Sequence, residues 1–403
     1  MKKIVTFLIL FIATVAVYAQ DEAKYKTYEP GFYHRFILRD VRAVKAAQED
    51  GEKEKYLVMD HSDKQIPDDP DDYTRMWAQP SISQGNAGTC WAYGGTSFVE
   101  SEHKRLGGDA LKLSEMFTVY WEYVEKARRY VKTRGESNFT QGSQANAVTR
   151  MIKMHGAVPE SAYSGLKGGR KYHSHEKMMK EMQSFLTSVK EDDAWNEKAV
   201  ISTIQSIMHH HMGEPPAEFE YSGETFTPES FRNEVLKFRP EDYTDVMSTM
   251  AVEYGETGLY DVPDNWWKSD AYYNLELDAY MDLLQDALEN GYTAAIGGDV
   301  SEAGFSRKTN AAMIPDFDIE SKNINAAARE FRFANKSTTD DHIMHIIGFQ
   351  KFKGDIWYLV KDSSSGSRNT EKDAAGFGYY FMHEDYIKLK ILTFTVHKSV
   401  LNN

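Results

Sequence analysis

The chain contains a single cysteine, Cys90, which stands at the start of a helical pattern. One thiol per chain cannot form an internal disulfide, so stability must come from a packed core. Behind it, residues of one helix face recur at spacings of three and four: Ala92, Thr96, Val99, His103 and Leu106. The alternative for a lone cysteine is a small buried apolar side chain. A thiolate at a helix N-terminus is stabilised by the helix dipole, so this context favours a nucleophile.

The first residues have the pattern of an export signal. Lys2 and Lys3 precede an apolar stretch over residues 4–17, and Ala19 offers a small residue at a cleavage site. The apolar stretch is shorter than the roughly 20 residues of a membrane span. We therefore predict a signal peptide over residues 1–19, export to the periplasm or the extracellular space, and no stable membrane association.

Composition narrows the class of partner. Apolar residues make up 41% of the 403 residues and aromatic residues 13%, which is typical of a globular protein. The formal net charge of −14 argues against nucleic acid and anionic membrane partners, because both favour clustered Lys and Arg.

Two groups of histidines raise the question of a metal. They are His173 with His175, and His209 to His211. No cysteine or carboxylate stands near them at the spacing of a zinc site, so a packed or solvated surface is favoured. We expect neither a metal nor a cofactor.

Changes in pattern divide the chain into five segments. The first two are the signal peptide and a polar, acidic extension with a Pro-containing linker near its end. A helical lobe, a charged helix-rich insertion and a β-rich lobe follow. The predicted bounds are 1–19, 20–75, 76–166, 167–290 and 291–403. The extension is interpreted as structural, the alternative being a removable inhibitory segment.

A predicted β-hairpin near the C-terminus carries a histidine and an aspartate. Strand patterns over residues 342–349 and 356–360 flank a turn at 351–355. A turn centred there places His342 nearly opposite Asp362, and cross-strand Cβ atoms lie about 5 Å apart. His345 is three residues further along and is expected on the opposite face.

These residues fit the needs of acyl transfer by a thiol. That chemistry requires a nucleophile, a base, a group that orients the base, and donors for the oxyanion. Cys90, His342 and Asp362 can fill the first three roles in order. The side-chain amide of Gln84 and the backbone N–H of Cys90 can fill the last.

Three segments resemble the active-site segments of papain-like cysteine peptidases. They are Gln84 to Tyr93, Asp341-His342, and Lys361 to Gly366 with Gly376 to Tyr379 beyond. Within that superfamily the chain is most similar to bleomycin hydrolase and bacterial aminopeptidase C, over about residues 76–395. Further segments carry this likeness: Leu113 to Glu115, Gly156 to Pro159, Thr227 to Arg232, and Tyr273-Asn274.

The resemblance implies a fold, an activity and a set of contacts. The expected fold is α+β and two-lobed, with a helical lobe, an antiparallel β-barrel-like lobe and a helical insertion. The expected activity is hydrolysis of peptides. Gly142 and Ser143 stand where the family has a Gly-Gly pair that binds substrate main chain. Trp91 and Asp341, within the matched segments, complete the expected substrate contacts.

Departures from the family leave alternatives open. Asp362 replaces an asparagine and Ser364 a tryptophan, so we expect activity with a shifted pH profile. The alternative is a catalytically inactive binding protein of the same fold. In bleomycin hydrolases a C-terminal arm enforces aminopeptidase action and lies inside a hexameric ring. Here the chain stops at residues 400–403, so aminopeptidase action, an open endopeptidase cleft and a homo-oligomer all remain expectations, as does a related amidase or transglutaminase.

Overall fold

The computed structural model describes residues 23–27, 55–368, 371–372 and 374–402. The predicted signal peptide, residues 1–19, lies outside this part of the chain. None of the described helices combines the length and the apolar character that a membrane span requires.

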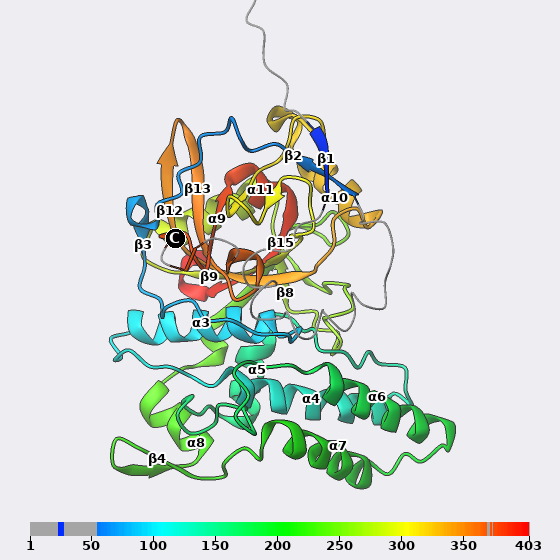
Figure 1. The fold of residues 1–403 in the computed structure, drawn as a ribbon. Coiled ribbons are helices and arrows are strands. Elements are labelled where there is room, and N and C mark those ends of the chain that lie inside the picture. The colour runs from blue at the N-terminus through cyan, green and yellow to red at the C-terminus, as the bar shows by residue number, and fades with distance from the viewer. Residues whose placement is uncertain (1–22, 28–54, 369–370, 373, 403) are drawn as a thin grey trace, which may run out of the picture.

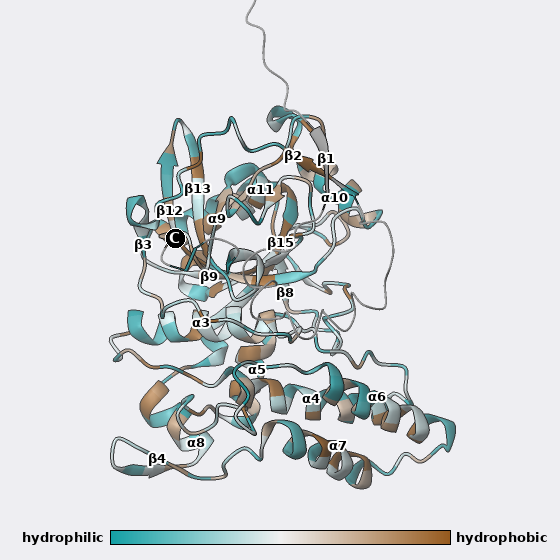
Figure 2. Cartoon of the chain, in the orientation of Figure 1, coloured by the Kyte–Doolittle hydropathy of each residue, from teal (hydrophilic) through white to brown (hydrophobic). Residues whose placement is uncertain are grey.

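A group of helices forms the lower part of the molecule in Figure 1. They are α3 (Cys90–Arg105), α4 (Glu115–Lys132), α5 (Asn146–His155), α6 (Glu176–Glu191), α7 (Glu197–Met212) and the short α8 (Pro228–Phe231). The side chain of Ser114 caps α4 by accepting a hydrogen bond from the Phe117 N–H at 3.0 Å. Figure 2 shows hydrophilic and hydrophobic residues alternating along α6 and α7, the pattern of helices with one buried face.

An eleven-stranded sheet forms the upper part. Its strands are β3 (Thr74–Arg75), β6 (Tyr243–Met247), β7 (Thr257–Gly258), β8 (Tyr272–Asn274), β9 (Ala294–Gly298), β10 (Phe305–Ser306), β11 (Ala311–Ala312), β12 (His342–Phe352), β13 (Asp355–Lys361), β14 (Tyr379–His383) and β15 (Ile391–His397). They run in the order β10, β11, β14, β13, β12, β9, β15, β6, β8, β7, with β3 beside β12. Only the pairs β11–β14 and β6–β8 are parallel. The segment 167–290 thus adds strands to the sheet as well as helices.

Smaller elements surround these two parts. Helices α9 (Leu277–Glu289) and α11 (Glu384–Lys390) pack on the sheet, and α10 (Ala326–Ala334) contacts α11. Two pairs of strands form separate two-stranded sheets: β1 (Ala23–Thr27) with β2 (Lys55–Met59), which contacts β10, and β4 (Phe219–Tyr221) with β5 (Glu224–Phe226).

The hairpin of β12 and β13 has nearly the predicted register. Phe352 pairs with Asp355 across a tight turn, and His345 pairs with Lys361. A β-bulge between Ile346 and Gly348 shifts the pairing by one residue. His342 therefore lies just beyond the paired region, beside Asp362 rather than in strict register with it.

Helix α3 lies between the helical part and the sheet (Figure 1). Its Gly94 approaches β12 so closely that a Cβ there would lie 3.1 Å from the Ile343 side chain and 3.3 Å from its backbone. Its Gly95 approaches α5 in the same way, with a Cβ position 2.5 Å from Val148. The helix that begins at Cys90 is therefore packed directly against the strand that begins at His342.

Candidate active site

Cys90 is the first residue of α3 and is partly exposed. The loop before it is tied to a segment of the helical lobe through Gln141. The Gln141 side-chain Oε1 accepts from the Gly88 N–H at 2.8 Å, and its carbonyl accepts from Trp91 Nε1 at 3.0 Å. These two bonds hold the backbone before Cys90 and the side chain of the residue after it.

His342 is buried and lies between Cys90 and Asp362. Its Nε2 is 2.7 Å from Asp362 Oδ1, which leaves Nδ1 for the hydrogen bond with Cys90. Burial lowers the pKa of the His342 imidazole, but Cys90 and Asp362 outweigh it and raise that pKa well above its ordinary value. The structure thus places Cys90 beside an imidazole whose protonated form is favoured by its neighbours.

Asp362 is fully enclosed, and its second carboxylate oxygen is occupied. Oδ2 accepts from the Ser364 N–H at 3.0 Å and from Ser364 Oγ at 2.5 Å. Burial acts to raise the pKa of Asp362, but His342, Arg368 and Ser364 hold that pKa well below its usual range. Arg368 also anchors the turn, since its Nη1 donates to the Ser364 carbonyl at 2.8 Å.

Ser364 also belongs to this site, although the sequence alone shows only that a serine replaces the family's tryptophan at this position. The signal for its role is the spacing, because a serine two residues after an aspartate can bond back to that carboxylate in a tight turn. The Asp362–Ser364 pair replaces the family's asparagine with an ionised acceptor whose far oxygen has its own donors.

Gln84 joins the nucleophile loop to the turn that carries Asp362. Its backbone N–H donates to the Ser363 carbonyl at 2.9 Å, and its Oε1 accepts from Ser363 Oγ at 2.8 Å. Its Nε2 donates to the Ala87 carbonyl at 2.8 Å. A primary amide carries two N–H donors, so a second one is available for an oxyanion.

The expected substrate contacts are distributed around this centre. Ser143 turns its hydroxyl inward, donating to the buried Glu122 Oε1 at 2.6 Å. The buried Lys126 donates to the Gly142 carbonyl. Asp341 is exposed, and its carboxylate accepts from the Val300 N–H at 2.9 Å and from the Ser301 hydroxyl. The Asp341 carboxylate therefore anchors the loop at residues 300–301.

His345 lies on the face opposite His342, as predicted. It is fully buried, and its Nδ1 is 2.9 Å from Ser97 Oγ, which also accepts from Lys361 Nζ at 2.8 Å. Burial and the charge of Lys361 lower the pKa of His345 well below its usual value. A buried, neutral imidazole turned toward Ser97 is not placed to take a proton from Cys90.

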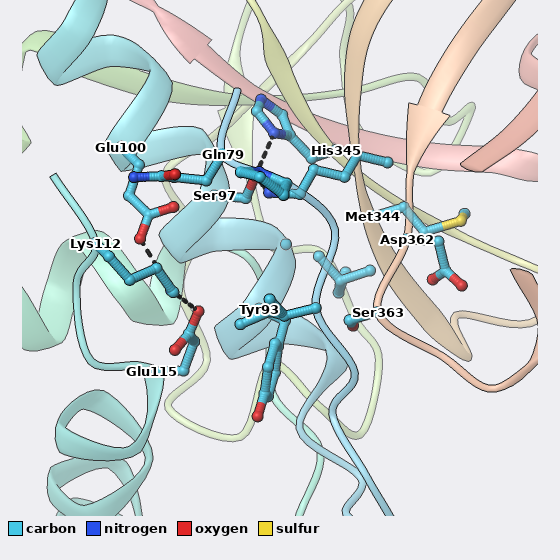
Figure 3. A pocket seen from close by; sticks show the side chains of 15 residues that line it. Gln79, Tyr93, Ser97, Glu100, Lys112, Glu115, Met344, His345, Asp362 and Ser363 are labelled. Carbon is cyan, nitrogen blue, oxygen red and sulfur yellow. Dashed lines mark hydrogen bonds and ion pairs between the residues drawn. The ribbon is translucent and has the colours of Figure 1, made fainter. Parts of the chain in front are cut away.

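Figure 3 shows the small pocket that His345 lines, between α3 and the sheet. Lys112 lies there between two buried carboxylates, 3.0 Å from Glu100 Oε1 and in contact with Glu115. Asp362 borders the same pocket. The charged side chains of Glu100, Lys112 and Glu115 in this pocket are therefore paired with one another.

The histidine groups are used in packing contacts. His209 Nε2 is 2.8 Å from the Tyr120 hydroxyl, and His211 Nε2 is 2.8 Å from Glu181 Oε2. A set with metal-ligand geometry in the described chain is Asp355, His383 and Glu384, at the opposite end of β13 from Asp362.

The comparisons with known proteins identify the family of the chain and its fold. A model of the Peptidase C1-like family matches residues 43–403, so the chain belongs to that family and is a cysteine peptidase. Among solved structures, PepW of Lactobacillus rhamnosis HN001 is similar with a TM-score of 0.61 at 16% identity, over 81% of this chain and 82% of that one. The predicted papain-like α+β fold is confirmed.

A second neighbour is the clostridial cysteine protease Cwp84, with a TM-score of 0.38 and 12% identity, covering 79% of this chain and 54% of that one. No curated protein matches the chain.

Proposed function

We propose that this protein is an exported thiol aminopeptidase that acts through Cys90, His342 and Asp362. The observation that carries the proposal is the position of His342, which bonds to Asp362 at 2.7 Å on one side and to Cys90 on the other. The raised pKa of His342 and the lowered pKa of Asp362 favour a thiolate–imidazolium pair at neutral pH.

The proposed reaction has two halves, the acylation of Cys90 and the hydrolysis of the resulting thioester. The Cys90 thiolate attacks the scissile carbonyl carbon, and the oxyanion accepts hydrogen bonds from the Cys90 N–H and the Gln84 amide. The His342 imidazolium gives its proton to the leaving amine as the C–N bond breaks. His342, now neutral, takes a proton from water, whose oxygen attacks the thioester. The Cys90 thiolate then leaves, and the carboxylic acid is released.

The position of the C-terminal tail bears on the choice between exopeptidase and endopeptidase action. Residues Lys398–Asn402 form a 3-10 helix, and Ser399 Oγ is 2.7 Å from the Tyr292 hydroxyl. Tyr292 in turn lies under Arg105, the last residue of α3, at 4.1 Å. Cys90 is at the other end of this 16-residue helix, about 24 Å away. The described tail is therefore remote from the nucleophile, and a group that recognises a substrate's N-terminus must come from another segment.

Three measurements test the proposal. A Cys90→Ala variant should stay folded by circular dichroism and lose all peptidase activity, and an epoxide inhibitor should alkylate wild-type Cys90 far faster than it alkylates a free thiol. Alkylation at the free-thiol rate would contradict the proposal and favour an inactive binding protein. One peptide offered with a free or an acetylated N-terminus separates the two kinds of cleavage, since an aminopeptidase should fail on the acetylated form.

Export is proposed from the predicted signal peptide. The N-terminus of the protein recovered outside the cytoplasm should begin directly after Ala19. Recovery of an uncleaved chain from the cytoplasm would contradict this part.

A further inference from the structure

A carboxylate from a distant segment lies against the expected substrate-binding segment. Asp264 belongs to the loop between β7 and β8, and a Cβ built on Gly142 would lie 2.2 Å from its Oδ2 and 2.7 Å from its Oδ1. Only glycine at position 142 leaves room for the carboxylate. Gly142 directly follows Gln141, which bonds to the backbone beside Cys90. Asp264 therefore lies beside the residue that follows Gln141, and Gln141 holds the segment that carries Cys90.

The Asp264 carboxylate is half-buried, and no described residue donates a hydrogen bond to it. Burial raises the pKa of Asp264, and the positive charge of Lys126 opposes that effect. Lys126 itself donates to the carbonyls of Thr140 and Gly142, not to Asp264. The other charged neighbours are Glu122, which is paired with Arg150, and Asp340. A partly buried carboxylate with no donor among the described residues still needs hydrogen-bond donors, which water or a bound ligand can supply.

The free amino terminus of a peptide meets this need. An ammonium group offers three donors and a positive charge, and its hydrogen bonds to a carboxylate are roughly twice as strong as neutral ones. A substrate residue spans about 3.5 Å along the chain, so a carboxylate beside Gly142 that holds the substrate's N-terminus would limit how many residues precede the scissile bond. The tail of the chain, at the far end of α3, does not compete for this place.

We propose that Asp264 is the specificity residue that binds the α-ammonium group of the substrate and so limits cleavage to bonds near the substrate's N-terminus. This inference rests on the proposed peptidase function and names the group that makes it an exopeptidase. The alternative ligand for Asp264 is a basic side chain within a longer peptide, and the inference excludes that alternative.

The test compares Asp264→Asn with a matched control on the same loop. Asp261 is exposed and pairs with Lys268 at 2.7 Å, so Asp261→Asn removes the same charge without touching Gly142. Each variant is measured on one peptide with a free N-terminus, on its acetylated form, and on acetylated peptides with Lys or Arg near the scissile bond. Epoxide labelling of Cys90 reports whether the catalytic centre is intact.

We expect Asp264→Asn to lower kcat/KM on the free peptide by about 10- to 100-fold, with the labelling rate unchanged. Asp261→Asn should behave as wild type, and Asp264→Glu, which keeps the charge, should retain part of the preference for a free N-terminus. An unchanged ratio of free to acetylated turnover in Asp264→Asn would overturn the inference. So would a loss confined to the basic acetylated peptides. If wild type cleaves none of these peptides and labels slowly, the proposed function itself has failed.

Discussion

Replacing Asp362 by asparagine would restore the residue that related peptidases carry, yet we expect it to impair this enzyme. Asparagine can keep its oxygen on His342 Nε2, but its amide nitrogen must then face the Ser364 N–H, which donates to Asp362 Oδ2 at 3.0 Å. The Ser364 hydroxyl can rotate and accept instead, but a backbone N–H cannot. Turning the amide over places the same conflict against the His342 imidazolium.

The size of the effect follows from the bond that changes. A hydrogen bond to a charged group contributes about 1.5–3 kcal/mol, and one pKa unit corresponds to about 1.4 kcal/mol. Losing the negative charge should therefore remove about 1.5–3 kcal/mol of stabilisation from the imidazolium and lower the pKa of His342. The imidazolium gives the proton to the leaving amine, so the alkaline limb of kcat/KM should move to lower pH.

The effect on stability has a definite sign. The pKa of His342 in the folded protein is raised well above its usual value. Its contribution to stability is therefore fully present below the unfolded pKa of about 6.5 and is lost as pH rises through the folded value. The stability difference between wild type and Asp362→Asn should shrink at alkaline pH.

The assay is the pH dependence of kcat/KM, with Asp355→Asn as the control. Asp355 begins the strand that leads to Asp362 but is largely exposed, so its removal should leave the profile unchanged. An alkaline limb that stays in place or moves to higher pH in Asp362→Asn would refute the reasoning.

Three further outcomes are expected. A His345→Gln variant should keep kcat within a few-fold of wild type, because the ring faces away from Cys90, while urea unfolding shows a loss of about 1–3 kcal/mol from its buried hydrogen bond. A Lys112→Met variant leaves Glu100 and Glu115 buried without their cation and should lose about 3–5 kcal/mol of stability in urea unfolding. A Gly156→Ala variant should melt at a lower temperature, because its φ is +79° and a Cβ would meet the backbone of residue 228 at 2.2 Å.

The sequence predicts what short-range patterns determine. The spacing behind Cys90 predicts α3, and the turn at 351–355 predicts the hairpin that brings His342 to Asp362. The bulge after Ile346 is not predicted, because it depends on packing between strands that are distant in sequence.

Other contacts between segments that are distant in sequence are not predicted either, for the same reason. Asp264 follows Gly142 by more than a hundred residues, in a segment whose pattern indicates only a helical insertion. Strands β6 and β8 of that segment join the main sheet, because the edge of β15 accepts them there. Ser364 is close to Asp362 in sequence, but its role depends on the direction of the second Asp362 oxygen, Oδ2, which points back toward the turn and accepts from Ser364.

The close approach of Gly94 to Ile343 makes the alignment of Cys90 with His342 depend on how α3 packs against β12. The sulfur is carried on one side of that joint and the imidazole on the other, so a slight separation breaks their contact. Mild denaturant should therefore silence the enzyme before tryptophan fluorescence reports unfolding, and dilution should restore turnover without refolding of either half.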